Sequence, residues 1–303
     1  MILAITGATG FVGQALLDWA EQTGIAVRAL TRRPQPVRSG VAWISGDLHT
    51  PAALRELVRG TDAVIHVAGV VNAADPAGFE AGNVTGTRGV IEAAQAEGVA
   101  RFIAVSSLSA REPDLSVYGG SKARAEHLVT ASGLDWTVVR PPWIYGPRDA
   151  DTLDMFKAAR WGLMPMPPRE GRSSLIHVDD LARLLLALVP GGDGVSGQVF
   201  EPDDGRAGGW SHNELARAIG WAMGRRPWVI HLSRASLERA ARADRLLRRH
   251  RAKLTPDRVG YMVHPDWVVS HGARPPAALW EPQVPTLEGL QATAQWYREN
   301  RWL

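Results

Sequence analysis

The sequence predicts an α/β fold, a doubly wound parallel sheet with a smaller, mostly helical C-terminal lobe. The first half alternates short β-rich runs with amphipathic helical stretches, which is the pattern of parallel strands joined by crossover helices. A glycine-rich turn follows the first of these runs. From Gly146 the chain becomes rich in proline, glycine and arginine, and eight of its twelve tryptophans lie after residue 150. This change of composition indicates that a second structural unit begins there.

The strands of the predicted sheet are short apolar runs bounded by glycine or polar residues. We expect strands at residues 2–6, 26–31, 41–44, 63–67, 102–105 and 136–139. The intervening segments carry apolar residues at helical spacing, which predicts helices at residues 11–23, 54–59, 83–97 and 121–131. Gly98 follows the third helix at the position where a left-handed cap is common.

The second half contains fewer strand signals. Residues 175–178, followed by Asp179 and an apolar helix over 181–189, predict a return of the chain to the sheet. Asp179 and Asp180 are expected to cap that helix. Further helices are expected near residues 212–223, 236–248 and 286–299.

Composition excludes several classes of protein. With 303 residues, 45% of them hydrophobic, and a net charge of only +3, the chain is long enough to bury a core and is not disordered. The absence of cysteine excludes disulfides and cysteine zinc sites, and no histidine or carboxylate spacing predicts another metal site. No apolar run is long enough to span a bilayer and no secretory signal is visible, so we expect a cytoplasmic protein.

Positive charge is concentrated in one stretch of the chain. Residues 225–258 contain ten arginines and one lysine against three carboxylates, a net charge of +8. Such a stretch could meet nucleic acid, anionic lipid or a phosphorylated ligand. An amphipathic helix over 236–251 could also dock on a partner or a membrane surface, but we favour a solvated helix face and expect no nucleic-acid partner.

The turn after the first strand is the strongest local motif. Gly7, Gly10 and Gly13 lie between a strand and an amphipathic helix, as a dinucleotide-binding turn requires. Glycines allow the tight turn, the close approach of a pyrophosphate and the packing of helix on strand, while the helix N-terminus attracts phosphate. A glycine-rich turn without a ligand is the alternative, and the position of this turn in the βα pattern favours cofactor binding.

The end of the second strand distinguishes the two nicotinamide cofactors. An acidic residue there would bind the adenosine ribose of NAD, whereas this chain has Thr31 followed by Arg32 and Arg33. Two guanidinium groups suit a 2′-phosphate, so we expect NADP rather than NAD. An ordinary solvated basic loop is the alternative.

A second motif carries acid–base chemistry. Tyr118 and Lys122 are four residues apart, which puts a phenol and an ammonium group on the same face of a helix. The ammonium group stabilises the phenolate and makes the tyrosine a usable acid or base. With four tyrosines and three lysines, about 0.04 such pairs are expected by chance. Ser107 follows the fifth strand, where its hydroxyl could hold a substrate oxygen.

Together these motifs resemble the extended short-chain dehydrogenase/reductases, which include the NAD-dependent epimerase/dehydratases and the 3β-hydroxysteroid dehydrogenases. The resemblance covers most of residues 1–190 and implies a Rossmann sheet. It rests on residues 6–13, 46–48, 66–69, 83–87, 105–107, 118–122, 140–147 and 177–180. By the family pattern, Tyr118 is the acid/base, Lys122 holds the nicotinamide ribose and Ser107 polarises the carbonyl.

The resemblance also implies a set of cofactor-binding residues. Besides Tyr118 and Lys122, the set is Gly7, Thr9, Gly10, Phe11, Val12, Gly13, Arg32, Arg33, Asp47, Leu48, Val67, Ala68, Gly69 and Pro141. It predicts a dinucleotide-binding domain of residues 1–145 plus 173–200 and a substrate-binding lobe of residues 146–172 plus 201–303.

The sequence favours an NADP-dependent oxidoreductase that acts on a carbonyl or secondary alcohol of a small, fairly apolar molecule. Sugar-nucleotide epimerases commonly have an asparagine three residues beyond the arginine that matches Arg140, and this chain has Trp143. A sugar-nucleotide epimerase or dehydratase is therefore the first alternative. The second is a structural or sensor protein that holds NADPH without turnover, which the intact Tyr118 and Lys122 pair disfavours. A homodimer is left open.

Overall fold

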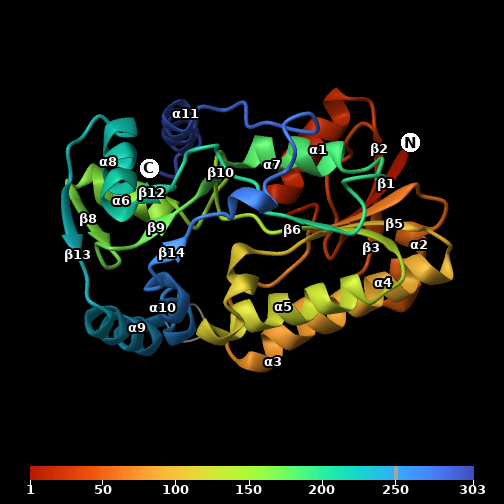
Figure 1. The fold of residues 1–303 in the computed structure, drawn as a ribbon, viewed down its shortest axis with the longest axis horizontal. Helices are drawn as coiled ribbons and strands as arrows, with labels where there is room; N and C mark the ends of the chain where they lie inside the picture. Colours follow the sequence, from red (N-terminus) through yellow and green to blue (C-terminus); the bar gives the residue numbers. More distant parts are fainter. Residues whose placement is uncertain (249–251) are drawn as a thin grey trace. The chain divides into compact units, whose positions relative to one another are not determined.

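The computed structural model describes residues 1–248 and 252–303, and these divide into two compact units (Figure 1). The first unit contains residues 1–141, 181–201 and 277–280. The second contains residues 142–180, 202–276 and 281–303. Residues 249–251, which belong to the basic stretch and to the amphipathic helix expected over 236–251, lie outside the described residues.

A parallel sheet forms the centre of the first unit. Within the described residues it has seven strands in the order β11-β6-β5-β4-β1-β2-β3. The strands are β1 (Ile2–Thr6), β2 (Ala26–Thr31), β3 (Val41–Ser45), β4 (Ala63–His66), β5 (Arg101–Val105), β6 (Asp135–Val139) and β11 (Gln198–Phe200). The order reverses between β1 and β4, and in such sheets ligands bind at the carboxyl ends of the strands beside this reversal. The predicted Rossmann architecture is confirmed.

Helices cover both faces of the sheet. They are α1 (Phe11–Gln22), α2 (Pro51–Val58), α3 (Pro76–Phe79), α4 (Gly86–Ala96), α5 (Val117–Thr130) and α7 (Val178–Ala187). Leu54 of α2, Val90 of α4 and Val129 of α5 pack in one core with Val64 and Phe102 of the sheet. Figure 1 shows α1 and α7 on the opposite face. Strands buried by helices on both sides, such as β4 and β5, read as nearly continuous apolar runs, which is why they could be predicted.

Three parts of the predicted element pattern differ from the structure. The helix expected over 83–97 is a π-helical segment, Glu80–Thr85, continued by α4. The helix expected from residue 121 begins at Val117, because Ser116 caps it by accepting a hydrogen bond from the Gly119 amide at 2.9 Å. The seventh strand, β11, was not predicted, since three residues are too few for a periodic signal.

The second unit combines small sheets with helices around its own core. Its strands are β7 (Trp143–Tyr145), β8 (Leu163–Met166), β9 (Arg172–Ser173), β10 (Leu175–His177), β12 (Trp210–Ser211), β13 (Trp228–His231) and β14 (Asp266–Trp267). Its helices are α6 (Leu153–Arg160), α8 (His212–Ala222), α9 (Arg234–Arg248), α10 (Pro256–Met262) and α11 (Thr286–Glu299). Tyr145, Phe156 and Tyr297 are fully buried at the centre of this core.

The expected return of residues 175–178 to the main sheet is wrong. β10 pairs in parallel with β7 and forms a separate two-stranded sheet. The expected cap is also wrong, because α7 begins at Val178 and both aspartates lie in its first turn. The carboxylate of Asp180 accepts hydrogen bonds from the amides of Gln283 and Val284 at 3.0 and 3.1 Å. It therefore fixes the segment that leads into α11.

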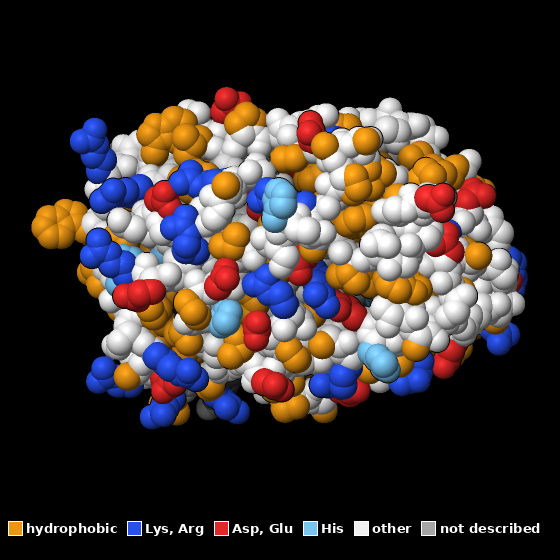
Figure 2. Space-filling model, viewed as in Figure 1, with side chains coloured by type: hydrophobic (Ala, Val, Ile, Leu, Met, Phe, Trp, Pro, Cys, Tyr) orange, Lys and Arg blue, Asp and Glu red, His pale blue; other side chains and the backbone are white. Residues whose placement is uncertain are grey.

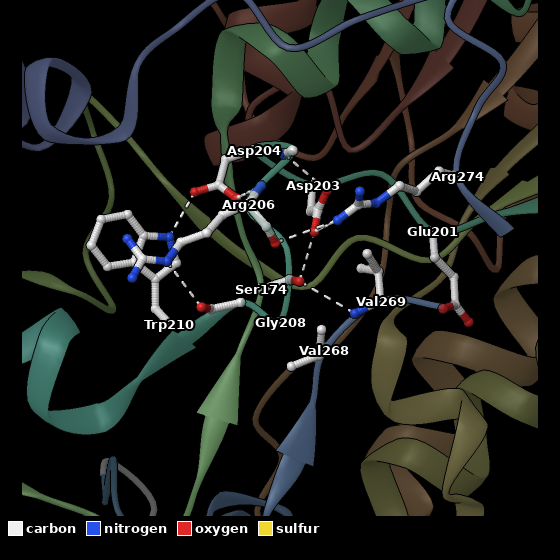
Figure 3. A network of polar contacts seen from close by, with 12 residues as sticks. Ser174, Glu201, Asp203, Asp204, Arg206, Gly208, Trp210, Val268, Val269 and Arg274 are labelled. Atoms are coloured by element: carbon white, nitrogen blue, oxygen red, sulfur yellow. Dashed lines mark hydrogen bonds and ion pairs between the residues drawn. The ribbon is translucent and has the colours of Figure 1, made fainter. Parts of the chain in front are cut away.

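A buried carboxylate organises the polar network of the second unit (Figure 3). Asp203 is 2% exposed and accepts hydrogen bonds from the Ser174 hydroxyl at 2.8 Å and from Nη2 of Arg274 at 2.9 Å. Burial raises the pKa of the Asp203 carboxyl, and the hydrogen bond from Ser174 and the charge of Arg274 oppose that shift. Beside it, the Arg206 guanidinium lies 4.0 Å from the centre of the Trp210 ring. The network ties the segment around residue 274 to β9 and β10.

Candidate active site

The glycine-rich turn lies where the first strand meets the first helix. Gly7 has a φ of 72°, and a Cβ there would lie 2.6 Å from the backbone nitrogen of Ala68. A Cβ at Gly13 would lie 2.1 Å from the carbonyl oxygen of Gly7. Both positions therefore require glycine, the first for its backbone angle and the second for the packing of α1 on the turn.

The N-terminus of α1 is free to receive an anion. Gly10 is its N-cap residue and has no side chain that could accept a hydrogen bond from the first amides of the helix. No acidic residue lies in its first turn. Thr9 and Gly10 are exposed, whereas Phe11 and Val12 are half-buried. Unpaired amides at a positive helix end fit the pyrophosphate of a nicotinamide dinucleotide.

The next two predicted cofactor segments follow β2 and β3. The Thr31 hydroxyl donates to the carbonyl oxygen of Arg33 at 2.6 Å, and this turn leaves Arg32 and Arg33 exposed. The Asp47 carboxylate accepts hydrogen bonds from the His49 amide and the Thr50 hydroxyl, both at 2.9 Å. These bonds, together with the nearby charges of His49 and Arg32, lower the pKa of Asp47. Leu48 packs against the core of the sheet.

A chain of buried hydrogen bonds holds the end of β4, which leads to Val67, Ala68 and Gly69. His66 is 3% exposed and lies between the hydroxyls of Thr6 (2.7 Å) and Thr87 (2.9 Å). Thr87 donates to the carbonyl oxygen of Asn83 at 2.6 Å, so His66 donates to Thr87 through Nε2 and accepts through Nδ1. Burial lowers the pKa of His66 to about 3, and the ring is neutral. The Ala68 amide donates to the Thr6 hydroxyl at 3.2 Å, which fixes the segment beside the glycine-rich turn.

The Tyr118 and Lys122 pair lies on α5 at the carboxyl edge of the sheet. The ammonium group of Lys122 is buried and donates to the carbonyl oxygen of Val105, the last residue of β5, at 2.8 Å. A Cβ at Gly69 would lie 3.4 Å from Nζ of Lys122, so the segment after β4 passes next to this amine. Burial lowers the pKa of Lys122 to about 8, and the charge of Glu126 opposes that shift. Tyr118 is half-buried, with its ring centre 6.1 Å from that of Phe79.

Ser107 lies in the loop between β5 and α5. It is the N-cap residue of a short 3₁₀ turn, Leu108–Arg111, and its hydroxyl accepts a hydrogen bond from the Ser109 hydroxyl at 2.8 Å. A Cβ at Gly119 would lie 2.7 Å from the carbonyl oxygen of Ser109, which shows how closely this turn approaches α5. Pro141 is buried and accepts a hydrogen bond from the Leu108 amide at 3.0 Å.

The structure thus gathers all the predicted site residues of the first unit at one edge. Each lies just beyond the carboxyl end of a parallel strand, on the N-terminal turn of α1, or on α5, which Lys122 joins to β5. Their roles in binding or catalysis stay predictions.

A further group of residues supports this edge. The sequence analysis did not include them among the predicted site residues. Asn83 donates through its amide to the Ser121 hydroxyl at 2.8 Å and accepts a hydrogen bond from the Val70 amide at 2.6 Å. It therefore links α5 to the segment after β4. Asn83 lies in a motif that the family resemblance includes, but its contacts depend on the π-helical segment, which no periodic pattern reveals.

A carboxylate behind Lys122 belongs to the same group. Glu126 lies one turn after Lys122 and accepts hydrogen bonds from the Ser106 hydroxyl and from Arg140, whose Nη2 is 2.6 Å from Oε2. Arg140 also pairs with Glu201 at 3.5 Å, and Arg111 approaches the same carboxylate at 3.6 Å. Tyr118, Lys122 and Glu126 follow one another at intervals of four residues and therefore form a stripe along one face of the helix. This spacing is visible in the sequence.

In the second unit, Trp143 has its indole N–H occupied. Nε1 donates to the Thr152 hydroxyl at 3.0 Å. This side chain therefore has no remaining donor for the diphosphate of a sugar nucleotide. Within residues 1–248 and 252–303, no group of three or more histidine or carboxylate side chains is arranged to hold a metal ion.

Comparison with known proteins assigns the chain to a family. Residues 7–189 match the family model for NAD(P)H-binding proteins, so the chain belongs to this family. It is 38% identical over its whole length to ceramide reductase of Caulobacter vibrioides, of which it covers 96%. It is 33% identical to 2-alkyl-3-oxoalkanoate reductase of Stenotrophomonas maltophilia, over 63% of this chain and 67% of that protein.

Among solved structures, the chain is similar to UDP-glucose 4-epimerase of Thermotoga maritima in complex with UDP-glucose. The TM-score is 0.75 over 99% of this chain and 100% of that one, with 20% sequence identity, so the two share a fold. The family, the fold and the reductase relatives together make this protein an NAD(P)-dependent oxidoreductase. No helix in the described part of the chain has the length and apolar content needed to cross a membrane.

Proposed function

We propose that the protein uses NADPH to reduce a ketone on a long-chain, apolar substrate to a secondary alcohol. The observation that carries the proposal is the buried amine of Lys122, one helical turn from Tyr118 and next to Gly69, where the cofactor is expected. An ammonium group in this position can hold a ribose hydroxyl and stabilise the phenolate of Tyr118. A protein that only stored NADPH would have no need of this pair.

The reaction requires one hydride and one proton. When bound, NADPH would be the source of the hydride for the carbonyl carbon. The hydroxyl of Tyr118 donates its proton to the carbonyl oxygen, and Ser107 donates a hydrogen bond to the same oxygen. Lys122 holds the nicotinamide ribose and lowers the cost of the negative charge left on Tyr118. Solvent then returns a proton to Tyr118.

The preference for NADPH rests on the end of β2. Arg32 and Arg33 are exposed there, and position 31, where NAD enzymes use an acidic residue, is a threonine whose hydroxyl is turned to the backbone of Arg33. A 2′-phosphate would bind these guanidinium groups. Arg32→Ala should weaken NADPH binding and leave NADH binding nearly unchanged. Arg55→Ala, an exposed arginine on α2, is the control, and equal affinity of the unaltered protein for both cofactors would contradict the preference.

The substrate class rests on two observations. The chain is similar over its whole length to a ceramide reductase, and the matched 2-alkyl-3-oxoalkanoate reductase also acts on an alkyl-chain substrate. In addition, Trp143 offers an apolar surface whose N–H is already used by Thr152. We therefore propose a lipid ketone of the ceramide class. Calorimetry on the NADP-loaded protein tests this choice, since micromolar binding of a UDP-sugar, about −8 kcal/mol, would favour an epimerase instead.

A further inference from the structure

The second unit carries an unusual two-stranded ribbon. β8 and β13 pair in parallel, with Leu163 beside Trp228 and Pro165 beside Ile230. All four of these side chains are exposed, at 48% for Leu163, 81% for Trp228 and 45% for Ile230. Trp161, two residues before Leu163, is 82% exposed. We call these five residues the ribbon face.

The ribbon face is apolar although the opposite side of the ribbon already packs in the core. Met164 and Met166 are fully buried, and Val229 packs against the same core. A strand with one face in the core normally exposes polar side chains on the other. Single exposed apolar residues are common, but here they are neighbours across the two strands and form one patch. A patch of this kind indicates a binding surface.

Positive charge borders the ribbon face. Residues 155–169 contain Lys157, Arg160 and Arg169, and residues 215–237 contain Arg217, Arg225, Arg226 and Arg234, with no carboxylate in either segment. Arg225 and Arg226 are exposed and come just before Pro227 and Trp228, while the Arg160 guanidinium lies 6.0 Å from the Trp161 ring centre. In the described part of the chain, Arg234 alone of these seven has a carboxylate partner, Glu238.

The helix that follows β13 has the same character. On α9, Leu246 and Leu247 are 81% and 84% exposed, and Arg242, Arg245 and Arg248 are exposed beside them. In the region where Figure 1 labels β8 and β13, Figure 2 shows exposed hydrophobic side chains with several Lys and Arg side chains, and a few Asp or Glu, around them. The element that sequence reasoning assigned to a solvated helix face thus continues the chemistry of the ribbon face.

We propose that the ribbon face and its arginine border dock on the surface of an anionic lipid bilayer. Tryptophan is favoured at the level of the lipid headgroups, leucine and isoleucine enter the acyl boundary, and arginine binds anionic headgroups. A second copy of the chain fits poorly, because it would bring two arginine borders together. Nucleic acid fits poorly as well, since leucine, proline and isoleucine make no hydrogen bonds to base edges.

Sedimentation of the full-length protein with vesicles tests the docking. The protein should pellet with phosphatidylcholine vesicles that contain phosphatidylglycerol and stay in the supernatant with phosphatidylcholine alone. Added salt should weaken the binding. The double variant Trp161→Ala/Trp228→Ala, and separately Arg225→Glu/Arg226→Glu, should each reduce vesicle affinity by about tenfold or more. NADPH binding by the variants serves as the measure of correct folding.

A matched control distinguishes a loss of binding caused by the patch from one caused by the change in net charge. Arg55→Glu/Arg88→Glu makes the same change in net charge on exposed residues of α2 and α4 and should keep the vesicle affinity close to that of the unaltered protein. Equal losses in the two charge variants, or no pelleting of the unaltered protein with anionic vesicles, would overturn the proposal. So would a fall from dimer to monomer in the tryptophan variant by light scattering, or tight binding of single-stranded RNA that both patch variants abolish.

Discussion

Lys122 shows how a single side chain ties the fold to chemistry. Its amine is buried, donates to the last carbonyl of β5 and lies beside the segment that follows β4. Burial alone would make the ammonium group costly, and Glu126 one turn further along α5 offsets part of that cost. The residue therefore keeps its charge at neutral pH while remaining in a site that excludes most water.

Tyr118→Phe tests the proton donor. The ring and its contact with Phe79 are kept, whereas the transferable proton is lost, so turnover should fall by about 10²–10⁴-fold. NADPH binding should persist, because the glycine-rich turn is unchanged. The control is Tyr261→Phe on α10, which is not among the predicted catalytic or cofactor-binding residues and should keep turnover near that of the unaltered enzyme. Equal turnover by the Tyr118 variant and the unaltered enzyme would exclude Tyr118 as the acid.

The pKa of Lys122 predicts a pH dependence. With a pKa of about 8 in the free enzyme, the amine loses its proton as the pH rises above that value, and the hydrogen bond that we propose it makes to the nicotinamide ribose should weaken. We expect kcat/KM for NADPH to fall above about pH 8. Lys122→Arg keeps its charge at high pH and should lack this fall, even if its activity is lower. An unaltered enzyme with a flat profile to pH 10, about two units beyond the amine's pKa, would contradict the assignment.

At the scale of the element, the parallel strands were the most predictable part of the chain. Runs such as residues 2–6 and 63–67 contain a single polar residue each, because helices cover both faces of the sheet. β10 misled the prediction for the same reason. It is as apolar and as buried as a central strand, and only its pairing with β7 reveals that it belongs elsewhere. Local sequence does not encode the partner of a strand.

The candidate site, like the sheet, could be predicted only in part from the sequence. Residues with local signatures, the glycine-rich turn and the Tyr118 and Lys122 pair, could be recognised from spacing. Three other residues support that edge. Asn83 contacts Val70, 13 residues away, and Glu126 contacts Arg140, 14 residues away. Ser109 contacts Ser107 within one turn of the loop. Of these, only Glu126 continues a visible stripe. The others depend on the loop and π-helical geometry, which the sequence does not show.

The buried ion pair between Asp203 and Arg274 predicts a loss of stability. Arg274→Met leaves a carboxylate that is 2% exposed without its cation, so the free energy of unfolding should fall by about 3 kcal/mol. Arg234→Met is the matched control, because its ion pair with Glu238 is exposed and should contribute less than about 1 kcal/mol. Urea unfolding of the two variants measures both values. Equal losses in the free energy of unfolding of the two variants would show that burial of the ion pair does not increase its contribution to stability.

At the scale of the whole molecule, the two units carry different kinds of information. The first has a family-wide architecture whose carboxyl edge predicts where a cofactor binds. The second combines several helices with small sheets, and much of its core comes from segments far apart in sequence, such as α6 and α11. Substrate choice was therefore the part of the function that the sequence predicted least. The proposed substrate class depends instead on the similarity of the whole chain to a ceramide reductase.

We propose that the protein reduces a lipid ketone with NADPH, and a single assay can follow this reaction. The full-length protein is mixed with NADPH and a ceramide whose secondary alcohol is oxidised to a ketone, and the absorbance of NADPH is followed while mass spectrometry identifies the product. We predict that NADPH is consumed in step with a product that has gained two hydrogen atoms, and that NADH supports a slower reaction. No consumption of NADPH with this ketone, together with conversion of UDP-glucose to its epimer, would contradict the claim.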